Sequence, residues 1–282
     1  MYIFLQKNVI TSNGLYLYLP KVSQAIFIIY RIKINNMTKQ ALSFSRKDPA
    51  KFFKTLNKRV NDYFKENNLK RTGNWKLYTK AIVMFSLLIV PVVLILTVDL
   101  PTWAQILGMV IAGIGMAGVG MNVMHDGNHG AYSSKSWVNK FMGGSIYILA
   151  GNVYNWQVQH NVLHHTYTNI PGHDEDLDAG RVIRFTKEAK WEKFHKFQHY
   201  YSIFLYGLLT FNWCLTTDFK QMAGYLKRKL SYGEVKSPKI LWTTLVITKI
   251  IYFSIWIAVP MIIGVSWWKV LFGFFVMHSD HI

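Results

Sequence analysis

Thiol groups and acidic side chains are both scarce in this sequence. Among its 282 residues there is one cysteine, Cys214, so neither an internal disulfide nor a metal site built from several thiolates is possible. Acidic residues number 14 against 32 Lys and Arg, which gives a formal net charge of +18. No groove-reading motif for nucleic acid accompanies this charge, and the basic residues flank apolar runs instead. The charge therefore indicates the anionic face of a membrane, and no nucleic-acid partner is expected.

Apolar residues, in contrast, are abundant. Hydrophobic residues make up 51% and aromatic residues 16% of the chain, and the mean hydropathy is +0.14, values typical of a membrane protein. The uncharged runs 81–98 and 103–124 are each about long enough to cross a hydrocarbon core of roughly 30 Å. Asp99 and Pro101 supply a turn between them, so the pair predicts a transmembrane hairpin within an all-α fold. Small residues in the second run would let a neighbouring helix approach closely: Gly108, Gly113, Gly115, Gly118 and Gly120.

Four later apolar stretches are harder to assign. Residues 141–153 are too few to span comfortably. Residues 200–217 are long enough, but basic residues follow them and a histidine-rich segment precedes them, and both flanks are expected in the cytoplasm. We therefore place 200–217 at the interface or in a re-entrant element. Residues 240–264 then cross the membrane, and 267–278 begin a return span.

The N-terminal part differs from the rest. Residues 1–36 fit poorly with the remainder of the chain, and Met37 opens a more ordinary start. We interpret residues 1–36 as a doubtful extension, with a short membrane anchor as the alternative. Residues 37–80 are polar and basic and are expected to form a cytoplasmic, amphipathic segment at the membrane surface. Apolar residues recur in it at helical spacing: Phe52, Phe53, Leu56, Val60 and Phe64.

Ten histidines are present, and five of them form two tight groups. His125 and His129 have the spacing H-x3-H at the cytoplasmic end of the second apolar run. His160, His164 and His165 have the spacing H-x3-H-H. Residues four apart share one face of an α-helix, so each pair presents two imidazole rings to the same side. His165 would extend the second group sideways.

The residue types in these groups indicate a metal site. Neutral imidazole suits iron and zinc, and such ions need several converging ligands. Neither pair encloses a glutamate in the order H-E-x-x-H, which argues against a zinc hydrolase. A histidine site without thiols suits oxygen chemistry better than structural zinc. We therefore predict that the five histidines bind metal, with unrelated interfacial histidines as the alternative.

Several neighbours of the two groups are candidates for supporting roles. Asp126 and Asn161 are predicted either to orient imidazole rings or to cap the chain locally. Trp156 either lines a substrate tunnel or packs. His195 and His199 share a helical face and are interpreted as interfacial residues. The loop after the second group adds candidates for the site or for docking an electron carrier, with a solvated acidic loop as the alternative: His173, Asp174, Glu175 and Asp176.

The sequence around both groups resembles a known family. MHDGNHGAYS at 124–133 and WQVQHNVLHHTYTNIPGHDEDLDAG at 156–180 are similar to the first and second histidine boxes of the membrane fatty acid desaturases. The resemblance covers roughly residues 40–278. It is nearest in kind to bacterial acyl-CoA or acyl-lipid enzymes of the linoleoyl-CoA, front-end type.

The resemblance implies a desaturase domain over residues 81–278, with four transmembrane helices, amphipathic interfacial helices and a cytoplasmic histidine-rich region. It implies a non-haem centre of two iron ions, ligated by the five box histidines, that uses O2 to insert a cis double bond into a fatty acyl chain. Electrons would come from ferredoxin or a cytochrome, which is expected to be a separate protein because no His-Pro-Gly-Gly haem motif occurs. The implied setting is the bacterial inner membrane, in contact with membrane lipid.

The sequence departs from the family near its C-terminus. The family has a third box, Q/H-x-x-H-H, after the fourth helix, and no such motif occurs here. Residues 279–282 read as an aberrant tail, because Ser, Asp and His are costly in mid-membrane. We expect a truncated or frameshifted chain that lacks part of its iron site. His278 lies either near that site or in helix packing.

Three alternatives to an incomplete desaturase stay open at this point. The first is a genuine short protein whose missing ligands come from a second chain. A related histidine-box hydroxylase or ketolase would share the iron centre and differ in its product. A non-catalytic membrane fragment would bind no iron.

Overall fold

A computed structural model describes residues 9–11, 14–16, 42, 44, 47, 51–177, 180–234 and 236–279. The stretch 17–41, with Met37, and the tail 280–282 lie outside the described residues. The chain divides into two units, Met1–Asn67 and Asn68–Ile282.

The N-terminal unit contains a small hairpin and one helix. Strands β1 (Val9–Thr11) and β2 (Gly14–Tyr16) pair antiparallel, and they are the only β structure in the described part of an otherwise helical chain. Helix α2 (Phe52–Glu66) forms where the helical spacing of apolar residues predicts it. Its apolar residues Leu56 and Val60 are 45% and 42% exposed. Contact of this helix with a membrane surface stays a prediction.

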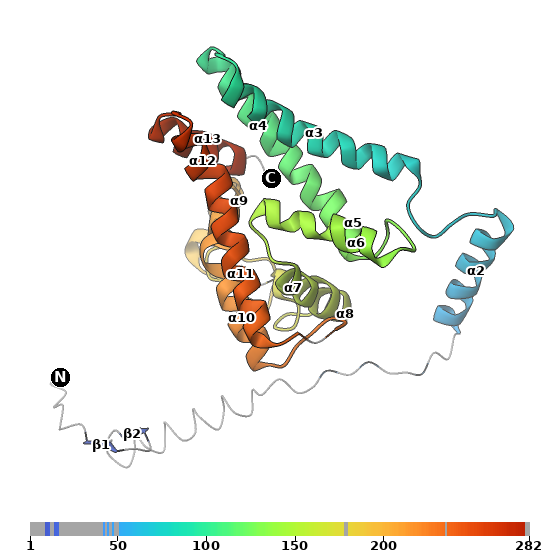
Figure 1. The fold of residues 1–282 in the computed structure, drawn as a ribbon. Coiled ribbons are helices and arrows are strands. Elements are labelled where there is room, and N and C mark those ends of the chain that lie inside the picture. The colour runs from blue at the N-terminus through green and yellow to red at the C-terminus, as the bar shows by residue number, and fades with distance from the viewer. Residues whose placement is uncertain are drawn as a thin grey trace. The chain divides into compact units, whose positions relative to one another are not determined.

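A long helical hairpin opens the second unit. Helix α3 (Trp75–Thr97) begins at Asn74, whose side chain accepts a hydrogen bond from the backbone N–H of Lys76. Helix α4 (Thr102–Gly118) continues through the π-helix η1 (Val119–Met124) into α5 (His125–Asn128). Figure 1 shows α3 and α4 side by side, as the predicted hairpin requires. Both helices are long and apolar enough to cross a membrane.

Short elements follow the hairpin and carry the second histidine group. The run 141–153 is divided between short helices and a bend, which agrees with the expectation that it does not span. The elements are α6 (Ser136–Gly143), the 3-10 helix η2 (Gly144–Leu149), α7 (Val153–Trp156), the π-helix η3 (Gln157–His164), α8 (His165–Tyr167) and the 3-10 helices η4 (Glu175–Leu177) and η5 (Lys193–Phe197).

Two long helical stretches and a final helix complete the unit. The first consists of α9 (Gln198–Asn212), the π-helix η6 (Trp213–Thr217) and α10 (Asp218–Lys227). The second consists of α11 (Pro238–Phe253), the π-helix η7 (Ser254–Ala258) and α12 (Val259–Ile262), and α13 (Trp267–Ser279) follows. Within the described residues, Pro238–Ile262 is the third helix suited to span a membrane, and the stretch containing 200–217 is not among the three.

The hairpin packs closely because α4 is rich in small residues. A methyl group placed on Gly115 would lie 2.4 Å from the backbone nitrogen of Leu88 in α3. Helix α13 packs on α4, and the resulting core buries Leu88, Met116, Val119 and Met277. Lipid is as apolar as these side chains, so close van der Waals packing must hold the helices together.

Replacing Gly115 by alanine is expected to lower the free energy of unfolding by about 1–3 kcal/mol, because the two backbones would have to separate. Thermal unfolding in detergent, followed by circular dichroism, measures the change. Gly224→Ala in α10 is the matched control, since nothing lies within 4 Å of its added methyl group. That change should be neutral or stabilising by about 0.5–1 kcal/mol. Equal effects of the two substitutions would contradict close packing at Gly115.

Candidate metal centre

The first histidine group lies at the end of the second membrane helix. His125 opens α5 directly after the π-helix η1, and His129 caps its C-terminus. Their ring centroids are 4.5 Å apart. A methyl group on Gly127, between them, would lie 2.4 Å from the backbone nitrogen of Gly143, so α5 is pressed against α6. The first group therefore lies where α5 and α6 pack closely together.

The second group lies on and directly after a π-helix, which the histidine spacing does not reveal. His160 and His164 belong to η3, and His165 begins α8 directly after it. Because the hydrogen bonds of a π-helix join residues five apart, His160 and His165 lie about one turn from each other. Their ring centroids are 4.7 Å apart, and those of His160 and His164 are 5.2 Å apart. His165 therefore faces the cluster, whereas in an α-helix it would point to one side of His160 and His164.

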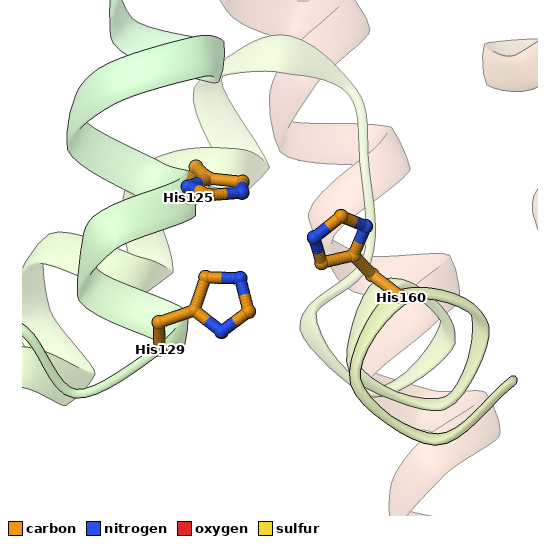
Figure 2. Close-up of side chains that lie close together, drawn as sticks. All are labelled: His125, His129 and His160. Carbon is orange, nitrogen blue, oxygen red and sulfur yellow. The ribbon is translucent and has the colours of Figure 1, made fainter. Parts of the chain in front are cut away.

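The two groups converge on one place. Figure 2 shows the rings of His125, His129 and His160 turned toward a common space, and one nitrogen from each lies within 4.8 Å of the others. A second set, His160, His164 and Asp176, meets the same limit. His160 belongs to both sets. His165 adjoins them, with its ring centroid 5.0 Å from that of His129.

The protonation of the central rings suits metal binding. Burial lowers the pKa of His160 to about 4, and the neighbouring histidines contribute to the same shift. Burial and the rings of His125 and His165 also lower the pKa of His129. These two imidazoles are therefore neutral at neutral pH and keep a lone pair for a metal. Nε2 of His160 is buried and has no hydrogen-bond partner.

An aromatic wall closes one side of the cluster. The ring of Trp156 stacks on His160 at 4.5 Å between centroids and an angle of 26°. The same ring lies 5.7 Å from both His125 and His129. Trp156 is 9% exposed and packs with Met124 and neighbouring residues. Its position is that of a packing residue against the histidines.

A carboxylate faces one ring of each group. Asp126 Oδ1 lies 3.2 Å from Nδ1 of His125, and Lys80 lies 3.8 Å from the other oxygen of Asp126. Nδ1 of His164 lies 3.1 Å from Asp174 Oδ1 and 3.0 Å from Asp176 Oδ2. A proton held on Nδ1 by a carboxylate leaves Nε2 free for a metal.

Asp174 is buried and firmly held. It is 2% exposed and accepts hydrogen bonds from the backbone N–H groups of Asn169 at 2.9 Å and Asp176 at 3.1 Å. Burial by itself raises the pKa of this carboxyl, but the hydrogen bonds from Asn169, His164 and Asp176 outweigh burial and lower the pKa. Asp174 is therefore ionised at neutral pH and can accept a hydrogen bond from Nδ1 of His164.

Asn128 links the two groups, and sequence reasoning missed it. Its amide donates to the carbonyls of Met124 and Gly143, each at 3.1 Å, and its Oδ1 accepts from Gln157 at 3.0 Å. The carbonyl of Asn128 accepts from the Asn161 amide at 3.3 Å. Asn161 thus ties one box helix to the other, and its amide is directed at this carbonyl and not at a box histidine. The only signal in the sequence was the position of Asn128 beside His129.

Two candidate histidines lie outside the cluster. His173 packs against Tyr167, with 5.2 Å between ring centroids, and belongs to neither metal set. His278 is 1% exposed, accepts a hydrogen bond from the hydroxyl of Tyr252 and donates to the carbonyl of Phe274 at 2.6 Å. The structure therefore agrees with the packing alternative for His278.

His195 has hydrogen-bond partners within the chain, which the interfacial interpretation did not include. Its ring is 7% exposed and lies between the carbonyl of Arg181 at 2.9 Å and the backbone N–H of Glu192 at 3.0 Å. His195 forms a reciprocal cap with Glu192 at the start of η5, which a pattern of i, i+4 histidines does not reveal. His199 is exposed and packs on Tyr200.

Comparison with known proteins adds independent information. A family model described as fatty acid desaturase matches residues 101–280. The chain is 30% identical over 233 residues to an sn-1 linoleoyl-lipid 6-desaturase of Arthrospira platensis, which covers 82% of this chain and 62% of that protein. It is 29% identical over 248 residues to an enzyme of the same name from Synechocystis, covering 87% and 67% of the two chains. An acyl-lipid (8-3)-desaturase of Mortierella alpina is 32% identical over 170 residues, which cover 58% of this chain and 38% of that protein.

The matched relatives are longer than the matched region. The chain spans 62% of the length of the Arthrospira protein, which is less than two thirds. No solved structure matches the chain.

Replacing Asn128 by alanine is expected to lower the free energy of unfolding by about 1–3 kcal/mol, because Gln157 and the Gly143 carbonyl lose a buried partner. Thermal unfolding in detergent measures this loss. Asn122→Ala is the matched control, because the Asn122 side chain donates to the Gly118 carbonyl of its own helix. Equal stability of the two variants would show that the link between the boxes contributes nothing.

Proposed function

Because the chain belongs to the fatty acid desaturase family, we propose that it desaturates fatty acyl chains at a non-haem iron centre. The observation that carries the proposal is the convergence of imidazole rings from two helices that are about 30 residues apart in the sequence. The proposed ligands are the histidines of the two boxes: His125, His129, His160, His164 and His165.

The donor set fits iron. Imidazoles without thiolates suit iron that handles oxygen. A buried nitrogen normally has a partner, so the unpartnered Nε2 of His160 supports an ion at this position. Each of the sets His125–His129–His160 and His160–His164–Asp176 could hold a metal ion, and because they share His160 they lie at one place. We propose two iron ions there from the family resemblance.

Iron supplies the oxidising power that side chains lack for breaking an unactivated C–H bond with O2. The residues of the chain hold and shape the site. Asp126 and Asp174 keep the Nδ1 protons of His125 and His164, which directs Nε2 of each ring toward the metal. Trp156 excludes water from one side of His160.

The balance of the reaction requires an external electron donor. Forming the double bond removes two protons and two electrons from the acyl chain. Reduction of O2 to two waters needs two further electrons and two protons. We propose that ferredoxin or a cytochrome supplies these electrons.

The fold supports an apolar substrate. A cavity of about 410 Å³, within the usual range for ligand sites, lies between α3, α4, η7 and α13. Val92, Met109, Trp256 and Phe274 line it, whereas the box histidines do not. The names of the three relatives specify acyl-lipid substrates, and we propose an acyl chain carried by membrane lipid, with CoA as the alternative carrier.

The charge distribution supports an orientation in the membrane. Lys70, Arg71, Lys76 and Lys80 lie before or in the first turns of α3, and positively charged flanks stay in the cytoplasm. His125 lies at the far end of the returning helix and so reaches the same side. We propose a bacterial inner-membrane protein with the histidine boxes facing the cytoplasm, and residues 37–80 on that surface.

His160→Ala is expected to abolish iron binding, because His160 belongs to both metal sets. Elemental analysis gives iron per chain after purification in detergent, and His199→Ala, outside both sets, should keep the iron of the unmodified chain. Activity is measured with linoleoyl-lipid vesicles, O2 and reduced ferredoxin, followed by mass spectrometry of the fatty acids.

If the five box histidines suffice for catalysis, the unmodified chain should form a product with one more double bond, and His160→Ala should form none. Iron binding without any product would agree with the expected incomplete iron site, whereas a hydroxylated product would refute the desaturase proposal. A chain without iron would refute the metal site itself.

Asp174→Asn is expected to weaken metal affinity by about 10–100-fold, because a neutral amide orients the His164 ring less strongly than a carboxylate does. Titration with Co²⁺, followed by absorption, measures the affinity. Asp62→Asn in α2 removes a carboxylate outside the two metal sets and serves as the control. Equal affinities of these two variants would rule out an orienting role for Asp174.

A further inference from the structure

A buried ion pair lies behind the second box. Lys249 Nζ is 2.7 Å from Asp218 Oδ2, and the two side chains are 7% and 0% exposed. Lys249 lies near the middle of the candidate span Pro238–Ile262, where an unpaired charge would be strongly unfavourable. Charged residues at such a depth are usually functional, yet the iron site makes no direct use of this pair.

Lys249 holds the bend that precedes the second box. Its ammonium group donates a hydrogen bond to the carbonyl of Ala150. Ala150 has φ of 62°, in the left-handed region that residues with a side chain rarely adopt. This residue ends η2, and α7 begins three residues later. Lys249 therefore fixes an unfavourable backbone position at the entry to the box helix.

Asp218 holds the start of the box helix itself. Its Oδ1 and its backbone carbonyl accept hydrogen bonds from the Asn155 amide at 2.9 and 2.7 Å. Asn155 is 1% exposed and directly precedes Trp156, the ring that stacks on His160. Trp213, at the start of the π-helix η6 that precedes Asp218, packs on the cluster containing Trp156. Asp218 thus reaches His160 through Asn155 and Trp156.

The local helix geometry around Asp218 resembles that of the boxes. The π-helix η6 ends immediately before Asp218, as η1 ends immediately before His125. π-Helical turns occur frequently at functional sites.

We propose that Asp218 and Lys249 are positioning residues, a charged brace that holds the second box helix, and with it His160, against the first box. The proposal deepens the proposed function, since the helix that the brace holds carries three of the proposed ligands. Removing one charge leaves the other buried and unpaired, whereas replacing both with apolar residues is often neutral for stability. The double replacement therefore separates positioning from general stability.

The first experiment needs no metal. Amide hydrogen exchange is measured on the metal-free chain and on Asp218→Leu/Lys249→Met. Exchange in residues 150–165 should rise about tenfold or more, while α3 and α4 stay unchanged. Asn155→Ala keeps the ion pair but cuts its link to the helix, and should reproduce the effect if the double variant folds poorly. Lys239→Met, an exposed site on the same helix, is the control.

The second experiment measures Co²⁺ affinity and the absorption spectrum of the bound ion. Asn155→Ala and the double variant should bind about 10–100-fold more weakly, with a changed spectrum. Unchanged exchange in 150–165, or a rise spread equally over the chain, overturns the proposal. Faster exchange with unchanged affinity and spectrum overturns the link to the metal site. If the unmodified chain binds no metal, the proposed function fails, and the exchange result alone decides whether the brace exists.

Discussion

Crowded imidazole rings can share one site only while they are uncharged. His160 lies within about 5 Å, centroid to centroid, of four other histidine rings, so a proton on it would be repelled from several sides and would also be poorly solvated. Burial and those neighbours lower its pKa to about 4. The remaining features of the site hold the other rings close around His160.

Carboxylates and backbone geometry meet this requirement together. Asp126 and Asp174 each face Nδ1 of one ring, which turns Nε2 of that ring away from the carboxylate. The π-helix η3 brings His160, His164 and the following residue His165 to one side, which an α-helix with the same sequence would not do. Asn128 then ties this helix to the first box through Gln157 and Asn161.

The membrane setting explains why polar links matter so much here. Apolar side chains gain little by leaving lipid for one another, so helices in a membrane are held by close packing and by hydrogen bonds. Gly115 permits the first, and the Asn155–Asp218–Lys249 network provides the second. A buried ion pair is weak as a source of stability but strict about geometry, and strict geometry is what a metal site needs.

The sequence by itself determined the local features. Uncharged runs predicted the hairpin 81–98 and 103–124 and a later span, because the length of an apolar segment sets whether it can cross a membrane. Histidine spacing indicated the five candidate ligands, because side chains four apart on a helix are neighbours wherever that helix lies.

Only the tertiary structure decided which of these groups meet. His165 joins the cluster through a π-helix that no sequence pattern marked, and His195 and His278 became buried packing residues with backbone partners. Hydrogen-bond partners 15 to 99 residues away in the chain give structural roles to Asn128, Asp218 and Lys249. The physical reason is that spacing along a helix is fixed by the covalent chain, whereas contacts between helices depend on how their surfaces pack.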